Sequence, residues 1–251
     1  MSIDLILLLG GLGSGILAGM LGIGGGSILV PLMVALGFTP IMAIGTSSLT
    51  IFFTSLSGTI QNWRMGYLNW ERISSMGLPA LIAAQFGAAL APSIPPSWLL
   101  IGFAMLMLTN IYLVDLKQQL INSESNPTPP QNKLLWGILT GSLAGLVAGL
   151  VGVGGGAIMV PLQMMLLGET IKVAIQNSLG VVVLTAASAT IGHSINHHVS
   201  YSQGLILGIG GLLGAQFGTR YLPKLPDILV SRLFRLTLLL VAIYSFVKGV
   251  S

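Results

Sequence analysis

The stretch LGIGGGSILVP, from Leu21 to Pro31, places three consecutive glycines inside an apolar segment near the start of the chain. Each glycine in a helix interior costs roughly 0.8 to 1 kcal/mol relative to alanine, so a triplet predicts a break in the helix. The chain repeats the pattern as VGVGGGAIMVP, from Val151 to Pro161. Two equivalent breaks are therefore expected to organise the fold.

The composition around these breaks is that of a membrane protein. Only 6% of the 251 residues are charged and 53% are hydrophobic, whereas an ordinary soluble domain is about 25% charged. The longer apolar runs match a bilayer core of about 30 Å. The chain has no cysteine, which excludes disulfides and cysteine-ligated metals. We therefore predict an all-α polytopic membrane protein.

The chain is an internal duplication with a shift of about 131 residues. Besides the glycine motifs, the tetrapeptide AQFG begins at Ala84 and again at Ala215. The expected organisation is an N-terminal repeat at 1–116, a polar linker at 117–133 and a C-terminal repeat at 134–251. Apolar segments run approximately over 4–21, 26–37, 42–61, 73–92 and 97–116, then over 134–151, 156–168, 173–192, 202–222 and 228–248.

The segment after each glycine triplet is too short to cross a membrane, because about 12 residues reach only about 18 Å. It could form a hairpin with the preceding segment, or the two could make one broken span. The hairpin arrangement inverts the repeats and places nine basic residues on one side and Lys248 on the other, whereas the broken span divides the ten equally. The positive-inside rule favours the hairpin. We therefore predict inverted repeats, a cytoplasmic linker, both termini outside and glycine turns that meet near the bilayer centre.

These turns are the predicted substrate site. The helices after them are expected to begin around Gly25 and Gly155, so their first N–H groups lack acceptors and carry partial positive charge. Glycine allows close approach to that backbone, and an anion is the natural ligand. Transporters with inverted repeats use broken helices in this way. The alternative, that glycines only allow close helix packing, is favoured for Gly15 and Gly19 and for Gly145 and Gly149. A dinucleotide-binding loop is not expected, because the strand and acidic residue that accompany it are missing.

Neutral donors at matching positions complete the predicted site, although a Ser or Thr could instead form an interhelical hydrogen bond. Ser57 and Ser188 are such a pair of candidates. The predicted substrate-binding residues are Gly24, Gly25, Gly26, Ser27, Thr46, Ser47 and Gln85 in the first repeat, and Gly154, Gly155, Gly156, Ala157, Asn177, Ser178 and Gln216 in the second.

His193, His197 and His198 are expected to lie in a solvated loop at the outer end of a helix. No nearby carboxylate or cysteine completes a metal site, so neither a metal nor another cofactor is expected. His193 could instead carry a proton. The sequence shows no catalytic acid and base set, and we expect no enzyme. The basic residues are spread over successive loops as orientation signals, so no nucleic-acid partner is expected.

The doubled motif G-x-G-G-G-x-x-x-V-P resembles the sulfite exporter TauE/SafE family. The resemblance rests on GMLGIGGGSILVPLMVALG, AIGTSSL and SLSGTIQNWRMGYLNW in the first repeat and on GLVAGLVGVGGGAIMVPLQMMLLG, AIQNSLG and SATIGHSINHHVSY in the second. The second repeat departs from the family pattern at one place, where Gln176-Asn177-Ser178 stands at the positions of Gly45-Thr46-Ser47 in the first repeat.

The resemblance implies transport of small sulfur-containing anions, such as sulfite or organosulfonates, across the cell membrane of a prokaryote. Our leading hypothesis is a secondary transporter, with export as the expected direction, that exposes a central site to each side in turn. A proton is the candidate coupling ion, and the lipid bilayer is the expected environment. An anion channel of the same architecture is the alternative, and the oligomeric state is open.

Overall fold

The computed structural model describes residues 3–122 and 132–250, and it is helical throughout this part of the chain, apart from short turns and loops. The helices of the first repeat are α1 (Ile3–Leu21), α2 (Gly26–Ala35), α3 (Pro40–Arg64), α4 (Trp70–Leu90) and α5 (Pro96–Asn122), with the 3₁₀ turn η1 (Ala91–Ser93). Those of the second are α6 (Lys133–Val151), α7 (Gly156–Leu166), α8 (Ile171–Ile195), α9 (Tyr201–Tyr221) and α10 (Asp227–Val250), with η2 (Leu222–Lys224). The prediction of an all-α membrane protein is confirmed.

Each predicted apolar segment corresponds to one helix. The largest difference is α5, which continues to Asn122, past the predicted end at 116. Its extension, residues 117–122, reads KQQLIN, and Lys, Gln and Leu are good helix formers although they are not all apolar. The remainder of the predicted linker, at 123–131, lies outside the described residues.

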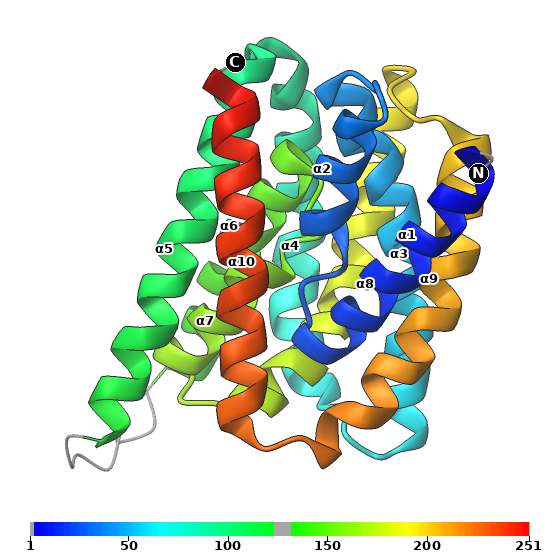
Figure 1. Ribbon diagram of the computed structural model, residues 1–251. Coiled ribbons are helices and arrows are strands. Elements are labelled where there is room, and N and C mark those ends of the chain that lie inside the picture. Colours follow the sequence, from blue (N-terminus) through cyan, green and yellow to red (C-terminus); the bar gives the residue numbers. More distant parts are fainter. Residues whose placement is uncertain (1–2, 123–131, 251) are drawn as a thin grey trace.

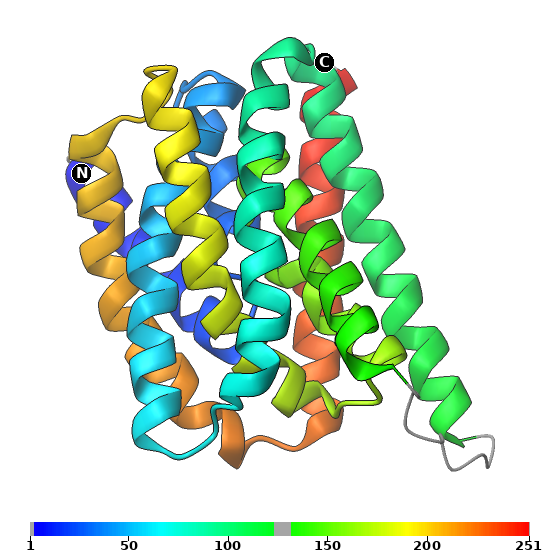
Figure 2. The same cartoon turned by 180° about the vertical axis from the view of Figure 1, so that it is seen from behind.

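The path of the chain is visible in Figures 1 and 2. Both ends of the described chain lie at one end of the bundle, and α5 ends and α6 begins at the opposite end. Helix α1 runs from the end with the termini into the bundle and α2 returns to that end, whereas α6 and α7 do the same from the opposite end. Each hairpin is followed by three helices that run the length of the bundle.

Six helical stretches in the described residues are long and apolar enough to cross a membrane, judged by length and composition. They are Ile3–Leu21, Pro40–Arg64, Trp70–Ser93, Lys133–Val151, Ile171–Ile195 and Asp227–Val250. Many large apolar side chains on the outside of the bundle are exposed, as expected of surfaces that face lipid. The chain is therefore multi-pass.

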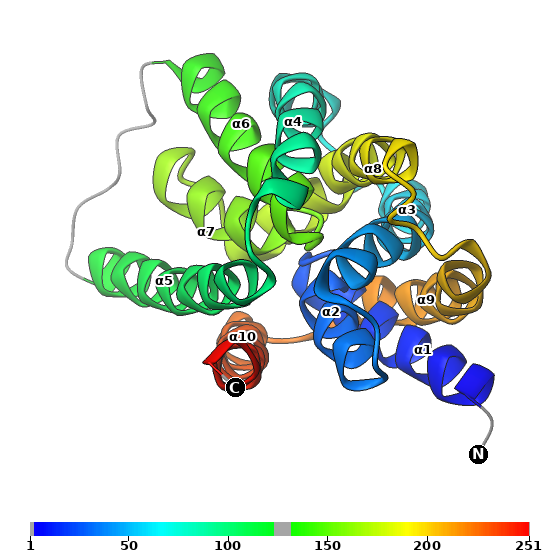
Figure 3. The same cartoon turned by 90° about the horizontal axis from the view of Figure 1, so that it is seen from above.

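The two repeats pack against each other. Helix α1 lies along α9, and the equivalent α6 lies along α4, while α3 and α8 lie side by side between these pairs (Figure 3). A Cβ on Gly15 would overlap the carbonyl of Gly211, and one on Gly145 would overlap the carbonyl of Ala80. The prediction that Gly15 and Gly145 allow close helix packing is confirmed.

Candidate functional site

The two glycine turns have the same backbone conformation. The φ angles of Gly22, Gly24 and Gly25 are 69°, 72° and 83°, and the second turn has 68°, 77° and 79° at Gly152, Gly154 and Gly155. Only glycine adopts this left-handed region at little cost. The sequence therefore forms a short unwound segment in each hairpin.

The helices that follow begin where the sequence predicted, at Gly26 and Gly156. In α2 the first hydrogen bonds run from the N–H groups of Ile28 and Leu29 to the Gly25 carbonyl. The N–H groups of Gly26 and Ser27 therefore have no acceptor inside the helix. Neither helix has a side-chain cap at its N-terminus.

The two turns are in contact with each other. A Cβ on Gly26 would overlap the carbonyl oxygen of Gly152, and a Cβ on Gly156 would overlap the carbonyl oxygen of Gly22. Each helix N-terminus thus faces a carbonyl oxygen of the opposite turn. Since a carbonyl oxygen carries partial negative charge, it interacts favourably with the positive end of the helix dipole.

The contact lies halfway along the bundle. A Cβ on Gly24 would be 3.0 Å from Ile51 and 3.1 Å from Val182, and a Cβ on Gly154 would be 2.9 Å from both. Counted from Pro40 and from Ile171, Ile51 and Val182 are each the twelfth residue of a 25-residue helix. Both side chains are fully buried and cover the glycine turns in this conformation.

Sequence analysis did not identify Ile51 and Val182 as part of the site. Apolar residues inside apolar helices give no chemical signal. The internal repeat supplies a weak signal, because these two positions are equivalent under the shift of about 131 residues and both carry a β-branched side chain.

Two of the predicted serines bridge the repeats. The Ser47 hydroxyl donates to the carbonyl of Gly152 at 2.9 Å, and the Ser178 hydroxyl donates to the carbonyl of Gly22 at 3.0 Å. These are the same carbonyl oxygens that face the helix N-termini. Both serines are fully buried, so each lies beside the predicted site and holds an opposing carbonyl in place.

Thr46 and Asn177 occupy equivalent positions and make equivalent bonds. The Thr46 hydroxyl accepts from the N–H of Ser200 at 2.9 Å, and the Asn177 amide oxygen accepts from the N–H of Asn69 at 3.2 Å. Ser200 and Asn69 are the N-caps of α9 and α4. In this conformation Thr46 and Asn177 fix the starts of neighbouring helices, and contact with substrate stays a prediction for both.

The two glutamines also bond between helices. Gln85 donates to the carbonyl of Ser188 at 2.8 Å, and Gln216 donates to the carbonyl of Ser57 at 3.1 Å. The hydroxyls of Ser57 and Ser188 donate in turn to backbone carbonyls of α9 and α4. These bonds give the glutamines a structural function between helices, and contact with substrate stays a prediction for both.

Ser27 differs from the other polar candidates. It is fully buried at the start of α2, and its hydroxyl has no hydrogen-bond partner within the described residues. An unpaired buried hydroxyl costs about 1 to 3 kcal/mol. The equivalent position in the second turn is Ala157. The structure therefore brings one free donor, together with unpaired backbone N–H groups, to the first turn.

The expectation of a solvated histidine loop is wrong for His193. His197 is exposed, but His193 is fully buried because α8 continues to Ile195 and packs against α6. Its Nε2 lies 2.9 Å from the carbonyl oxygen of Gly149. His198 lies beside it and is half-buried.

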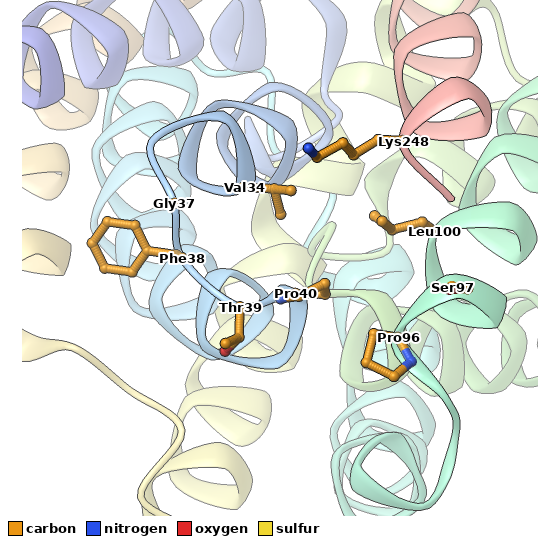
Figure 4. Close-up of a pocket in the computed structure, with 9 residues that line it drawn as sticks. All are labelled: Val34, Gly37, Phe38, Thr39, Pro40, Pro96, Ser97, Leu100 and Lys248. Atoms are coloured by element: carbon orange, nitrogen blue, oxygen red, sulfur yellow. The ribbon is translucent and has the colours of Figure 1, made fainter. Parts of the chain in front are cut away.

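A separate pocket of about 330 Å³ opens at the end of the bundle that carries the termini. Figure 4 shows that the turn from Gly37 to Thr39, the starts of α3 and α5, and Lys248 of α10 surround it. The positive ends of two helix dipoles and one lysine thus meet at this pocket. Such a combination attracts anions.

Comparison with known proteins finds similarity over nearly the whole chain. A family model described as "Sulfite exporter TauE/SafE" matches residues 7–245, which confirms the resemblance predicted from the paired glycine motifs. The chain is 26% identical to "Probable membrane transporter protein YunE" of Bacillus subtilis, with 98% of each chain covered. It is 29% identical to "Probable membrane transporter protein MJ0441" of Methanocaldococcus jannaschii, over 78% of this chain and 73% of that protein. These relatives support a membrane transporter.

Proposed function

The chain belongs to the TauE/SafE family, and on this premise we propose that it is a secondary transporter of small sulfur-containing oxyanions such as sulfite or organosulfonates. Export is the direction that the family description implies. The observation that carries the proposal is the meeting of two helix N-termini, at Gly26 and Gly156, halfway along the bundle.

Backbone N–H groups at these termini would bind the oxyanion. They combine partial positive charge with unpaired donors, and the buried hydroxyl of Ser27 adds a further donor. Neutral donors suit a transporter, because they bind an anion without retaining it as firmly as an arginine would.

The opposing carbonyls suggest how the site alternates. The carbonyl oxygens of Gly22 and Gly152 lie against the helix N-termini, where the substrate oxygens would lie. Anion binding therefore requires one turn to move away from the other, which exposes the site to the side from which that hairpin enters. The bonds from Ser47 and Ser178 stabilise the closed arrangement. Ile51 and Val182 cover the turns when both are closed, which favours a transporter over a channel with a permanent pore.

The arrangement of charge supports an orientation in the cell membrane of a prokaryote with both termini outside. The basic residues of the described ranges, Lys248 excepted, gather at the end where α5 ends and α6 begins. By the positive-inside rule this end is cytoplasmic.

Purified protein in proteoliposomes tests the proposal. Vesicles should be loaded with sulfite, sulfate, a sulfonate or a carboxylate, and efflux should be followed with and without a pH gradient. We expect saturable flux of sulfite or a sulfonate and uphill movement when a gradient is imposed. Flux that never saturates and never runs uphill would identify a channel, and the absence of flux for every sulfur oxyanion would contradict the proposed substrate class.

A further inference from the structure

His193 holds the end of the helix that leads into the second glycine turn. Its Nε2 is 2.9 Å from the carbonyl oxygen of Gly149. A carbonyl only accepts, so we assign the ring hydrogen to Nε2. Helix α6 ends at Val151, which leaves the Gly149 carbonyl among the last four without a partner inside the helix. His193 therefore caps α6 three residues before the turn begins at Gly152.

The other nitrogen of this ring is available for a proton. Nδ1 of His193 and Nδ1 of His198 are both buried and have no hydrogen-bond partner within the described residues. The two ring centroids are 6.5 Å apart. His198 is half-buried and its neighbour His197 is exposed, so His198 connects the buried ring of His193 with the surface of the protein at the end of the bundle with the termini.

His193 is the ionisable group beside the second glycine turn, and most groups that surround it do not titrate. On α3 it faces Gly45, on α6 it faces Gly149, and the adjacent Gly192 faces Gln85 of α4. None of these side chains titrates, and His198 is the titratable group that faces the ring. The equivalent position in the first repeat is Asn62, which cannot take up a proton, so only the second turn has this feature.

We propose that His193 is the binding site of a proton that moves together with the anion, and that His198 passes this proton to it from the end with the termini. The proposal rests on anion transport through the glycine turns. A proton on Nδ1 makes the ring a cation beside the second turn, where an anion stabilises it. Proton and anion therefore strengthen each other's binding, because linkage between two sites is reciprocal.

This coupling is compatible with export. When a proton and an anion move in the same direction, net flux follows the sum of the two gradients, so a high internal anion concentration drives both outward. The same protein drives uptake when an inward proton gradient exceeds the outward gradient of the anion.

The test compares His193→Gln with wild type in proteoliposomes under an imposed pH gradient and zero membrane potential. Glutamine retains an N–H that can donate to Gly149 but binds no proton. With one proton per anion, wild type should reach an anion concentration ratio of about tenfold per pH unit, and His193→Gln should reach a ratio near one. His198→Gln should slow the approach without changing the final ratio, since a relay affects only the rate.

His197→Asn is the matched control. His197 is exposed and has φ of 56°, a conformation that asparagine tolerates, so its rate and ratio should equal those of wild type. If His193→Gln sustains the wild-type ratio, or wild type transports anions without using the pH gradient, the proton site is wrong although the transport proposal stands.

A second measurement does not depend on flux. NMR of protein with ¹⁵N-labelled histidine in nanodiscs should show His193 as the neutral Nε2–H form at high pH and as the doubly protonated form on acidification with sulfite present. A ring that stays neutral down to about pH 4 in folded protein, far below the ordinary range of histidine, would overturn the proposal. The same spectra, with gel filtration, show whether His193→Gln is folded.

Discussion

The hydroxyl of Ser47 on α3 donates to the carbonyl oxygen of Gly152 at 2.9 Å, which ties the long helix of the first repeat to the glycine turn of the second. Ser178 and Gly22 repeat this bond at 3.0 Å with the repeats exchanged. Each hairpin is therefore held closed by the other repeat. Since the same carbonyls face the helix N-termini, the strength of these two bonds is expected to set how readily the site opens.

Loss of one of these bonds should loosen one turn. We expect Ser47→Ala to lower the free energy of unfolding by about 0.6 kcal/mol, the average of measured interhelical hydrogen bonds in a membrane protein. It should also increase hydrogen exchange at residues 152–156, measured by mass spectrometry. Ser74→Ala is the control, because Ser74 is exposed and bonds within its own helix. Equal protection of the turn in both variants would contradict this function of Ser47.

The unpaired hydroxyl at Ser27 should contribute to substrate binding and not to the stability of the closed state. A hydrogen bond to an anion contributes about 1.5 kcal/mol or more, so Ser27→Ala should raise KM about tenfold. The melting temperature should not fall, and it should rise if anything, because alanine no longer buries an unpaired hydroxyl in the closed state. Thr140→Val is the control, since Thr140 is also buried and unpaired but lies on α6 away from its glycine turn. A similar change of KM in both variants would argue against direct contact by Ser27.

Contact between the turns should not tolerate a side chain. A methyl group at position 156 would overlap the carbonyl oxygen of Gly22, so we expect Gly156→Ala to abolish or severely reduce flux while the protein still inserts into the membrane. Gly13→Ala is the matched control, because a Cβ there meets nothing within 4 Å. Flux should be measured at equal amounts of reconstituted protein. Wild-type flux in Gly156→Ala would show that the close contact is not needed for transport.

The pocket near Lys248 should concentrate anions at the end with the termini. We expect Lys248→Gln to raise KM about two- to threefold at low ionic strength, and this difference should vanish in high salt because exposed charges are screened. Lys224→Gln removes a lysine from η2 at the opposite end and serves as the control. Transport should be measured with substrate supplied on one side of oriented vesicles. A salt-independent change would indicate a structural function for Lys248.

Much of the fold could be predicted because the signals are local. Apolar runs separated by short polar segments predicted every helix, and the triplets predicted that α2 and α7 begin near Gly26 and Gly156. The end of α5 was missed because helix propensity, rather than apolarity, continues that helix to Asn122. Local patterns are sufficient for such features, since each depends on neighbours a few residues away.

The partners of the polar candidates could not be predicted. Nothing in the sequence near Thr46 shows that its hydroxyl caps α9 at Ser200, 154 positions away. Likewise, the sequence places His193 near a loop, but the packing of α8 against α6 buries it beside Gly149. These contacts depend on which helices pack together, and apolar helices of similar composition do not encode their partners locally.

The sequence alone determined that the chain is a duplicated, helical membrane protein with two broken hairpins, because hydropathy, glycine content and repetition are properties of the chain itself. Only the tertiary structure decided that the carbonyls of Gly22 and Gly152 face the helix N-termini and that Ile51 and Val182 cover the glycine turns. It also decided that His193 caps α6. The physical reason is distance along the chain. Each of these contacts joins residues that lie far apart in the sequence, and it forms only when the helices pack.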